Sequence, residues 1–332
     1  MAFLFYRNSN TERDSMTGNI VGNSHLTKKK SMKWKRIVPL YIMMLPGMIY
    51  FLINNFLPMA GVTIAFRKIN YQLGIWKSPW NGFENFEFLF ASGSVTRMIR
   101  NTILYNIAFI ILGTIIAIAV AILLNEIRLK FASRLYQTLI LLPYLMSMVV
   151  VSYLVYAFLS GETGYVNKVL LPALGINKTI SFYQEQVYWP FILVFVNIWK
   201  SVGFNMIIYL AAIIGISNEY YEAARVDRAS RWQQIRHITL PCLLPTVITM
   251  FILSVSKIFY SDFGLFYQVP KNSGALYPVT QTIDTYVFNA LMNQNNIGLS
   301  SAAGFLQAIV GCILVIAANA LVRKLSKENA MF

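Results

Sequence analysis

The sequence predicts an all-α integral membrane protein that crosses the bilayer six times. Hydrophobic residues make up 57% of the 332 positions, charged residues make up 12%, and the mean hydropathy is +0.55. Soluble domains carry about 25% charged residues, so this chain has about half the charge that a water-exposed surface needs. The composition therefore excludes an ordinary soluble domain.

Six apolar segments reach the length of about 20 residues that a helix needs to cross the hydrocarbon core. Four of them contain no Asp, Glu, Lys or Arg, and the other two contain only Lys200 and only Lys257. Backbone groups in lipid must be satisfied within the segment, so each segment is expected to be a helix, with kinks at the internal prolines Pro46, Pro143 and Pro245. The predicted spans are 37–58, 101–124, 135–161, 186–214, 239–261 and 299–322.

The distribution of Lys and Arg predicts the orientation, because cytoplasmic loops carry the excess of basic residues. Eighteen basic residues flank the spans on the side that holds both termini, and eight flank them on the other side. Both termini are therefore expected in the cytoplasm. The net charge of +15 lies at the ends of apolar segments, which favours contact with membrane lipid and excludes a nucleic-acid partner.

The transmembrane domain is expected over 37–327, with tails on either side. Residues 1–36 are rich in Asn, Ser and Thr and end in a basic run, which predicts a disordered basic tail; residues 328–332 form a short C-terminal tail. A signal peptide is the competing interpretation of the N-terminal region. The apolar stretch that follows is long and lacks a small-residue cleavage site, which argues against it.

The cytoplasmic loop 215–238 is predicted to contain two short helices. Ser217 can cap the first helix, and Glu219 would place a negative charge at its positive dipole end. The chain must turn near 227–229, and Ser230 with Gln233 has the spacing of a capping box for the second helix. An ordered loop of this kind favours docking onto another protein, and an amphipathic helix resting on lipid headgroups is the alternative.

This loop carries a family resemblance. Glu222-Ala223-Ala224, Asp227, Ala229 and then Ile238, Leu240 and Pro241 resemble the "EAA" coupling loop of binding-protein-dependent ABC importer permeases. The resemblance implies a six-helix type I importer permease fold, with a coupling helix that inserts into a cleft of an ATPase subunit. The residues implied in ATPase coupling are Glu222, Ala223, Ala224, Asp227, Arg228, Ala229 and Trp232.

One position departs from the family pattern. The family has Gly directly after the Asp, where the chain turns, and this sequence has Arg228. Gly reaches a positive φ without steric cost, whereas Arg would lose roughly 1 kcal/mol there. Either the turn is made differently, or a contact of Arg228 offsets the strain.

The resemblance also implies the partners and the location. The expected partners are a second homologous permease, two ATP-binding subunits and an extracytoplasmic solute-binding protein, in a bacterial cytoplasmic membrane. A heterodimer of permeases is expected, with a homodimer as the alternative. No Lys follows Gly and precedes Ser or Thr, so the chain has no P-loop and no catalytic residue, metal or cofactor of its own is expected; ATP and Mg would bind to the partner ATPase.

The substrate pathway is predicted from polar residues inside the spans, because intramembrane charges are costly unless paired or hydrated. Lys200 lies deep in the fourth span and is expected to face a wet cavity or a partner, whereas Lys257 could extend to the membrane surface. Aromatic rings near 259–267 could stack on sugars, gate the pathway or simply pack. The candidate pathway residues are Asn197, Lys200, Asn205, Lys257, Tyr260, Asp262 and Phe263.

Three segments indicate the cargo. Trp199-Lys200, the run 207–212 and Ile283-Asp284-Thr285-Tyr286 resemble the subgroup that imports polysaccharide fragments of the aldouronate type. With Lys200, this favours an acidic oligosaccharide, and a neutral one remains the alternative. Uptake of peptides or amino acids and a membrane-embedded transferase are the other functions considered.

Overall fold

The computed structural model describes residues 34–127, 129–176 and 178–325, whose regular secondary structure is helical apart from one isolated β-bridge between Arg67 and Trp80. Five helical segments in this part are long and apolar enough to cross a membrane, and the count is six if one sharply bent pair forms a single span. The predicted all-α membrane architecture is therefore confirmed. The five segments are Val38–Phe66, Ser94–Asn125, Gln186–Ile214, Arg231–Val255 and Ile297–Ala317.

The chain divides into two units, Met1–Phe56 and Leu57–Phe332. The described part of the first unit is α1 (Trp34–Phe51) followed by a π-helical turn, η1 (Leu52–Phe56). Every side chain from 38 to 56 is exposed. A helix of this length that is apolar all round is typical of a membrane-spanning segment. The predicted tail 1–36 lies almost wholly outside the described residues, as does the tail 328–332.

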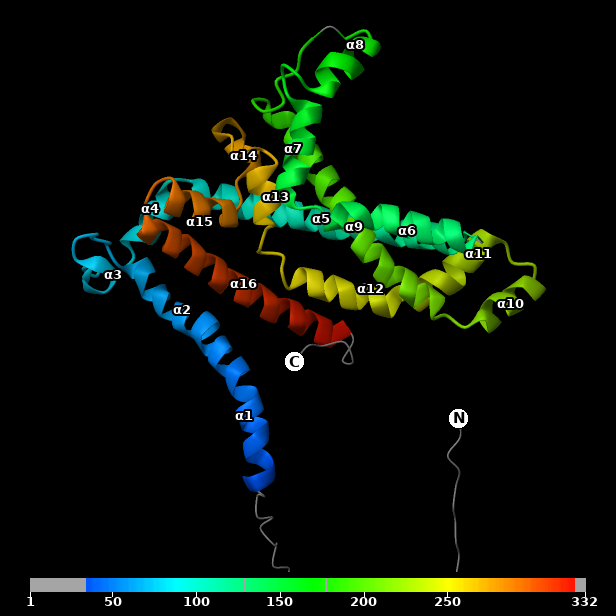
Figure 1. Ribbon diagram of the computed structural model, residues 1–332, viewed down its shortest axis with the longest axis horizontal. Helices are drawn as coiled ribbons and strands as arrows, with labels where there is room; N and C mark the ends of the chain where they lie inside the picture. Colours follow the sequence, from blue (N-terminus) through cyan, green and yellow to red (C-terminus); the bar gives the residue numbers. More distant parts are fainter. Residues whose placement is uncertain (1–33, 128, 177, 326–332) are drawn as a thin grey trace, which may run out of the picture. The chain divides into compact units, whose positions relative to one another are not determined.

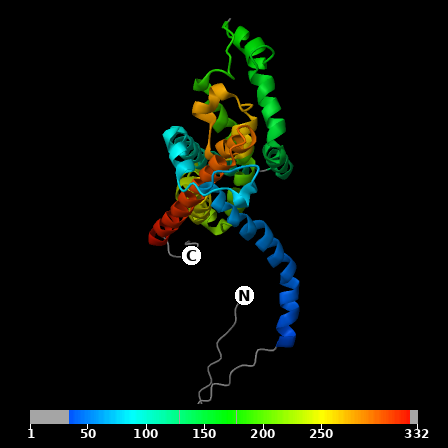
Figure 2. The ribbon, with the colours of Figure 1, turned by 90° about the vertical axis from the view of Figure 1, so that its left-hand side faces the viewer.

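The second unit is built around two long helices, α5 (Ser94–Asn125) and α9 (Trp189–Ile214), which pack along each other (Figure 1). α6 (Lys130–Leu145) and α12 (Leu240–Val255) also pack on α9, and α16 (Ile297–Leu325) packs on α15 (Ile283–Met292). α7 (Met148–Leu159) bends away from α6, and α8 (Leu171–Ala173) lies beyond the far end of α7 (Figures 1 and 2).

Short helices connect these long elements. On the N-terminal side they are α2 (Leu57–Met59), the 3₁₀ helix η2 (Ala60–Phe66), α3 (Gly74–Lys77) and α4 (Glu84–Ala91). Between α7 and α9 lie η3 (Val166–Leu170) and η4 (Gln186–Tyr188). Between α12 and α15 lie α13 (Phe263–Gln268), η6 (Gly274–Leu276) and α14 (Tyr277–Thr280).

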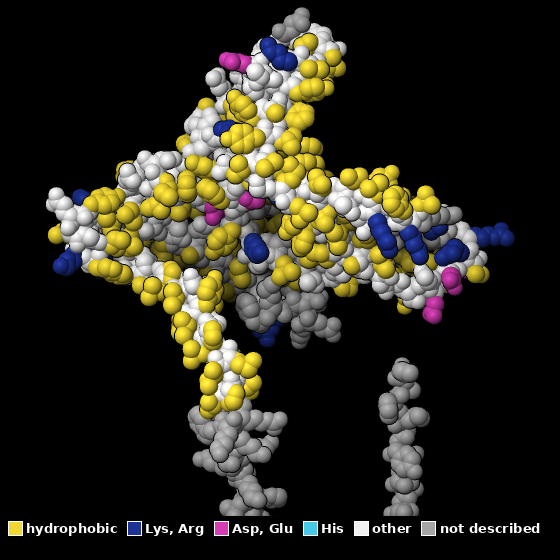
Figure 3. Space-filling view, in the orientation of Figure 1, with side chains coloured by type: hydrophobic (Ala, Val, Ile, Leu, Met, Phe, Trp, Pro, Cys, Tyr) yellow, Lys and Arg dark blue, Asp and Glu magenta, His cyan; other side chains and the backbone are white. Residues whose placement is uncertain are grey.

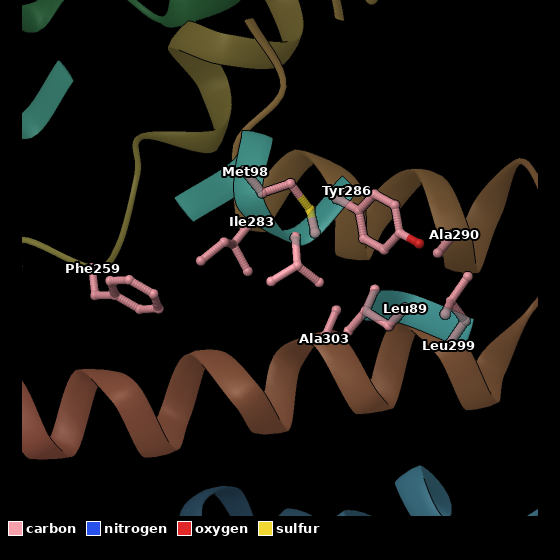
Figure 4. Close-up of a cluster of buried hydrophobic side chains, with 9 residues drawn as sticks. Leu89, Met98, Phe259, Ile283, Tyr286, Ala290, Leu299 and Ala303 are labelled. Atoms are coloured by element: carbon pink, nitrogen blue, oxygen red, sulfur yellow. The ribbon is translucent and has the colours of Figure 1, made fainter. Parts of the chain in front are cut away.

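Three apolar clusters hold the second unit together. One joins α4, α5, α15 and α16, and Figure 4 shows Met98, Ile283 and Tyr286 among its side chains. A second packs the start of α9 against α7 and α13, with Trp189 fully buried. The third lies between α5, α9 and the first half of α12, around Met206 and Tyr209. These clusters fix the positions of α5, α9 and α12 relative to one another.

The third predicted span, 135–161, is not one continuous helix. It is broken at Met146 and Ser147 into α6 and α7, and the two helix axes differ by 96°. Pro143 supplies no backbone N–H near the end of α6, and Ser147 starts α7 as its N-cap by accepting a hydrogen bond from the Val150 N–H. The helix therefore ends shortly after Pro143, and a new helix starts at the Ser147 cap.

The fifth span also differs from its predicted bounds of 239–261. The helical segment begins at Arg231, because α11 (Arg231–Gln234) continues through the π-helical η5 (Ile235–Thr239) into α12. The helix ends at Val255, residues 256–259 form turns, and residues 260–262 have no regular structure. The loop helix and the span are therefore one continuous element.

Gly203 permits the close contact between α9 and α6. A Cβ at this position would clash with the Ile140 carbonyl oxygen, so any side chain must push the two helices apart. We expect Gly203→Ala to lower stability by about 1–3 kcal/mol, measured as thermal unfolding of the detergent-solubilised protein. Gly304→Ala in α16 is the matched control, because a Cβ there meets nothing within 4 Å. Equal unfolding temperatures for both variants would contradict the close packing.

Candidate functional sites

The first helix of the cytoplasmic loop, α10 (Asn218–Val226), has the predicted cap. The Ser217 hydroxyl accepts a hydrogen bond from the Glu219 N–H, and Glu219 lies in the first turn. None of the nine residues of α10 is buried, and the Tyr220 and Val226 side chains are exposed. The large exposed side chains of this capped helix are accessible for contact with another molecule.

The turn after α10 has the left-handed conformation that the family motif implies. Arg228 takes a φ of 55°. The Ala229 N–H donates to the Ala224 carbonyl at 2.9 Å, and the Arg228 N–H donates to the Arg225 carbonyl at 3.1 Å. These two bonds form a Schellman motif. The turn is therefore made in the usual way, and within the described residues no side-chain contact of the exposed Arg228 offsets the strain.

The second loop helix also begins as predicted. Ser230 and Gln233 form a reciprocal capping box at the start of α11. Gln234 is buried and donates to the Ala229 carbonyl at 2.9 Å, which ties the turn to α11. The hydroxyls of Tyr221 and Thr239 lie 2.9 Å apart and connect α10 to η5. The loop is thus tied by hydrogen bonds to the helical segment that continues into α12.

The predicted coupling residues lie on or beside these loop helices. Glu222, Ala223, Asp227, Arg228 and Trp232 are exposed, and Ala224 and Ala229 are half-buried. Lys and Arg side chains gather at this end of the second unit (Figure 3), where α10 and α11 lie in Figure 1. Arg231 contributes a solvent-exposed ion pair to Glu126 at 3.8 Å, which adds little stability.

A polar groove of about 250 Å³ lies between α5, α9 and the end of α12. Four of the predicted pathway residues line it: Asn197, Asn205, Lys257 and Tyr260. Asn197, Ser201 and Asn205 follow the i, i+4, i+8 spacing of one helix face. Sequence reasoning missed the second wall, formed by Asn106, Phe109, Ile110 and Thr114 of α5, although Asn106 and Thr114 also lie on one helix face at that spacing.

Lys200 does not line the groove. Its ammonium donates to the carbonyls of Tyr144 at 2.9 Å and Met146 at 2.8 Å, and it lies 5.5 Å from the centre of the Tyr144 ring. The last carbonyls of a helix have no partner within the helix, and Lys200 satisfies two of them at the break between α6 and α7. Lys200 therefore has an internal structural contact and lies outside the groove lining, and its contact with a wet cavity or a partner subunit stays a prediction.

Asp262 and Phe263 also lie outside the groove lining. Asp262 caps α13 by accepting a hydrogen bond from the Leu265 N–H at 3.1 Å. Phe263 stacks on Tyr267 with 4.9 Å between ring centres and packs on Phe288. Both residues have structural partners within the chain.

Asp284 positions the chain next to the groove, although it was not among the predicted site residues. Its carboxylate accepts hydrogen bonds from the Ser261 N–H at 2.8 Å and the Ser261 hydroxyl at 2.6 Å, and from the Gln307 amide at 3.1 Å. These bonds fix the backbone beside Tyr260. Asp284 lies in a segment that carried the subgroup resemblance, but its contacts are with residues distant in the sequence.

A membrane-spanning helical bundle that combines a polar groove with an ordered helical loop defines an integral membrane transport component. The chain belongs to the family of binding-protein-dependent transport system inner membrane components, whose model matches residues 111–327. This confirms the family resemblance of the loop motif.

Relatives cover nearly the whole chain. Protein LplB of Bacillus subtilis is 34% identical over 308 residues, 92% of this chain and 96% of that protein. The polygalacturonan/rhamnogalacturonan transport system permease protein YteP of the same bacterium is 35% identical, over 87% of this chain and 89% of that protein. The crystal structure of a bacterial ABC transporter involved in the import of the acidic polysaccharide alginate matches with a TM-score of 0.79 and 34% identity, over 88% of this chain and 98% of that chain. The importer permease fold is therefore confirmed.

The strained turn offers a direct test of the loop geometry. We expect Arg228→Gly to relieve about 1 kcal/mol of strain, which corresponds to about fivefold slower hydrogen exchange of the α10 amides if α10 opens locally. Arg228→Ala is the control, because it removes the charge and keeps the Cβ. Slower exchange in both variants would assign the effect to the charge, and unchanged exchange in the Gly variant would show that the turn is unstrained.

Proposed function

We propose that this chain forms one half of the membrane pathway of an ABC importer for oligosaccharides delivered by a solute-binding protein. The observation that carries this proposal is the groove between α5, α9 and α12, lined by three Asn and two Ser side chains with an exposed Tyr260 ring. Amide and hydroxyl groups bind sugar hydroxyls, and an aromatic ring can stack on a sugar face. No feature of the described residues favours a peptide importer or a transferase.

The relatives support a saccharide cargo that carries acid groups. YteP is named for transport of polygalacturonan and rhamnogalacturonan, and the matching solved structures concern alginate. One of those structures is a complex with an alginate pentasaccharide-bound periplasmic protein. We extend this to uptake of an acidic oligosaccharide by the present chain, with a solute-binding protein as the donor.

The remaining assembly is proposed from the loop and the groove. The groove has walls on only three helices of this chain, so a second, homologous permease in a heterodimer would complete it. α10 and α11 would dock on one of two separate ATP-binding subunits, which would bind ATP and Mg. The chain itself would then move the cargo without hydrolysing ATP.

Docking through α10 can be tested by enlarging a small side chain. We expect Ala224→Arg to lower both oligosaccharide uptake and binding-protein-stimulated ATP hydrolysis at least tenfold in the reconstituted complex, because a bulky charge would prevent close approach of the ATPase. Ala132→Arg, at a half-buried position near the start of α6, is the matched control. ATP hydrolysis that remains substrate-stimulated in the Ala224 variant would contradict the docking site.

The proposed orientation places both termini in the cytoplasm. After replacement of Cys242 and Cys312, single cysteines at the exposed positions Ser230 and Gln294 should react with a membrane-impermeant thiol reagent from opposite sides. In intact cells, the cysteine at 294 should be labelled and the one at 230 should be labelled only after permeabilisation. Labelling of both from the outside would invalidate this topology.

A further inference from the structure

The two lysines of the predicted spans have different surroundings in the structure. The Lys200 ammonium donates hydrogen bonds to two backbone carbonyls and lies over the Tyr144 ring. Lys257 lines the polar groove, its side chain is exposed, and within the described residues it has no hydrogen-bond or ion-pair partner. We propose that Lys257 recognises a carboxylate of the cargo and is the charge-selecting residue of this permease, an inference that rests on the proposed function.

The backbone around Lys257 is held in a defined turn. The Lys257 N–H donates to the Ser254 carbonyl at 3.1 Å, and the Tyr260 N–H donates to the Lys257 carbonyl at 2.9 Å. The Asn106 amide donates to the carbonyls of Ile258 and Tyr260 at 3.0 Å each. The turn that follows α12 is therefore tied to α5, and the lysine stem starts from a fixed point.

Asp284 holds the other end of this segment through Ser261. That carboxylate also accepts a hydrogen bond from Gln307, and it is not one of the groove-lining residues. The Asp262 carboxylate accepts a hydrogen bond from the Leu265 N–H as the N-cap of α13. The acidic residues nearest in sequence therefore have their own partners, and neither forms an ion pair with Lys257 in the described part of the chain.

The groove consequently combines one positive charge with neutral hydrogen-bonding groups. None of its ten lining residues is Asp or Glu. A carboxylate placed at Lys257 would form a charge-assisted hydrogen bond, while the neighbouring Asn and Ser side chains could bind hydroxyls of the same molecule. A uronate-type sugar carries both kinds of group. A sugar without the carboxylate would use only the neutral groups.

The test compares an acidic saccharide with its neutral methyl ester. A uronate trisaccharide and its methyl ester are first checked by calorimetry, in order to choose a pair that the solute-binding protein binds. Uptake of both is then measured in proteoliposomes that contain the complete transporter. We expect Lys257→Gln to lower uptake of the acid about tenfold and to change uptake of the ester less than twofold, and we expect Lys257→Arg to retain most acid uptake.

Lys200→Gln is the matched control, because it removes the same charge from a position with a structural role. It should lower uptake of both saccharides equally. Equal losses for the acid and the ester in Lys257→Gln, or no loss for the acid, would overturn the assignment of Lys257. If the wild-type transporter takes up neither saccharide although the binding protein stimulates its ATP hydrolysis, the proposed oligosaccharide function itself fails.

Discussion

The break between α6 and α7 imposes the constraint on which the rest of the second unit depends. Carbonyl groups at a helix end inside a membrane have no water to bind, so protein atoms must satisfy them. Lys200 of α9 does so at Tyr144 and Met146, and Gly203 lets the two helices approach closely enough for this contact. The stacked rings of Tyr144 and Phe204, 4.9 Å apart, extend the same interface.

This interface fixes the rotation of α9 about its own axis. Lys200, Gly203 and Phe204 face α6, so the neighbouring stripe of Asn197, Ser201 and Asn205 is turned toward α5 and α12. The position of the polar groove therefore depends on the contact with α6 at another face of α9, where Lys200 satisfies the carbonyls at the helix break. Lys200 therefore helps to orient the helix that carries the polar wall of the groove.

The sequence predicted the cytoplasmic loop in detail because its structure is local. The caps at Ser217 and Ser230 and the turn near Asp227 depend on residues within about four positions of one another. The partners of Lys200, which satisfy the carbonyls at the break, and the role of Asp284 depend on contacts between segments separated by 23 to 56 residues. Hydropathy detects the length of a span but not the tertiary contact that permits a broken one, so these features were missed.

One continuous element connects the two candidate sites. The helix from Arg231 to Val255 begins in the loop and ends at the turn that holds Lys257, and its 25 residues correspond to about 37 Å at 1.5 Å per residue. The N-terminal part of this helix is tied to α10 through Tyr221 and Thr239, and the turn after its C-terminal end is tied to α5 through Asn106. A displacement of the loop by a docked ATPase would reach the groove through this helix, so the same element that receives the mechanical input also ends at the side chain proposed to hold the cargo.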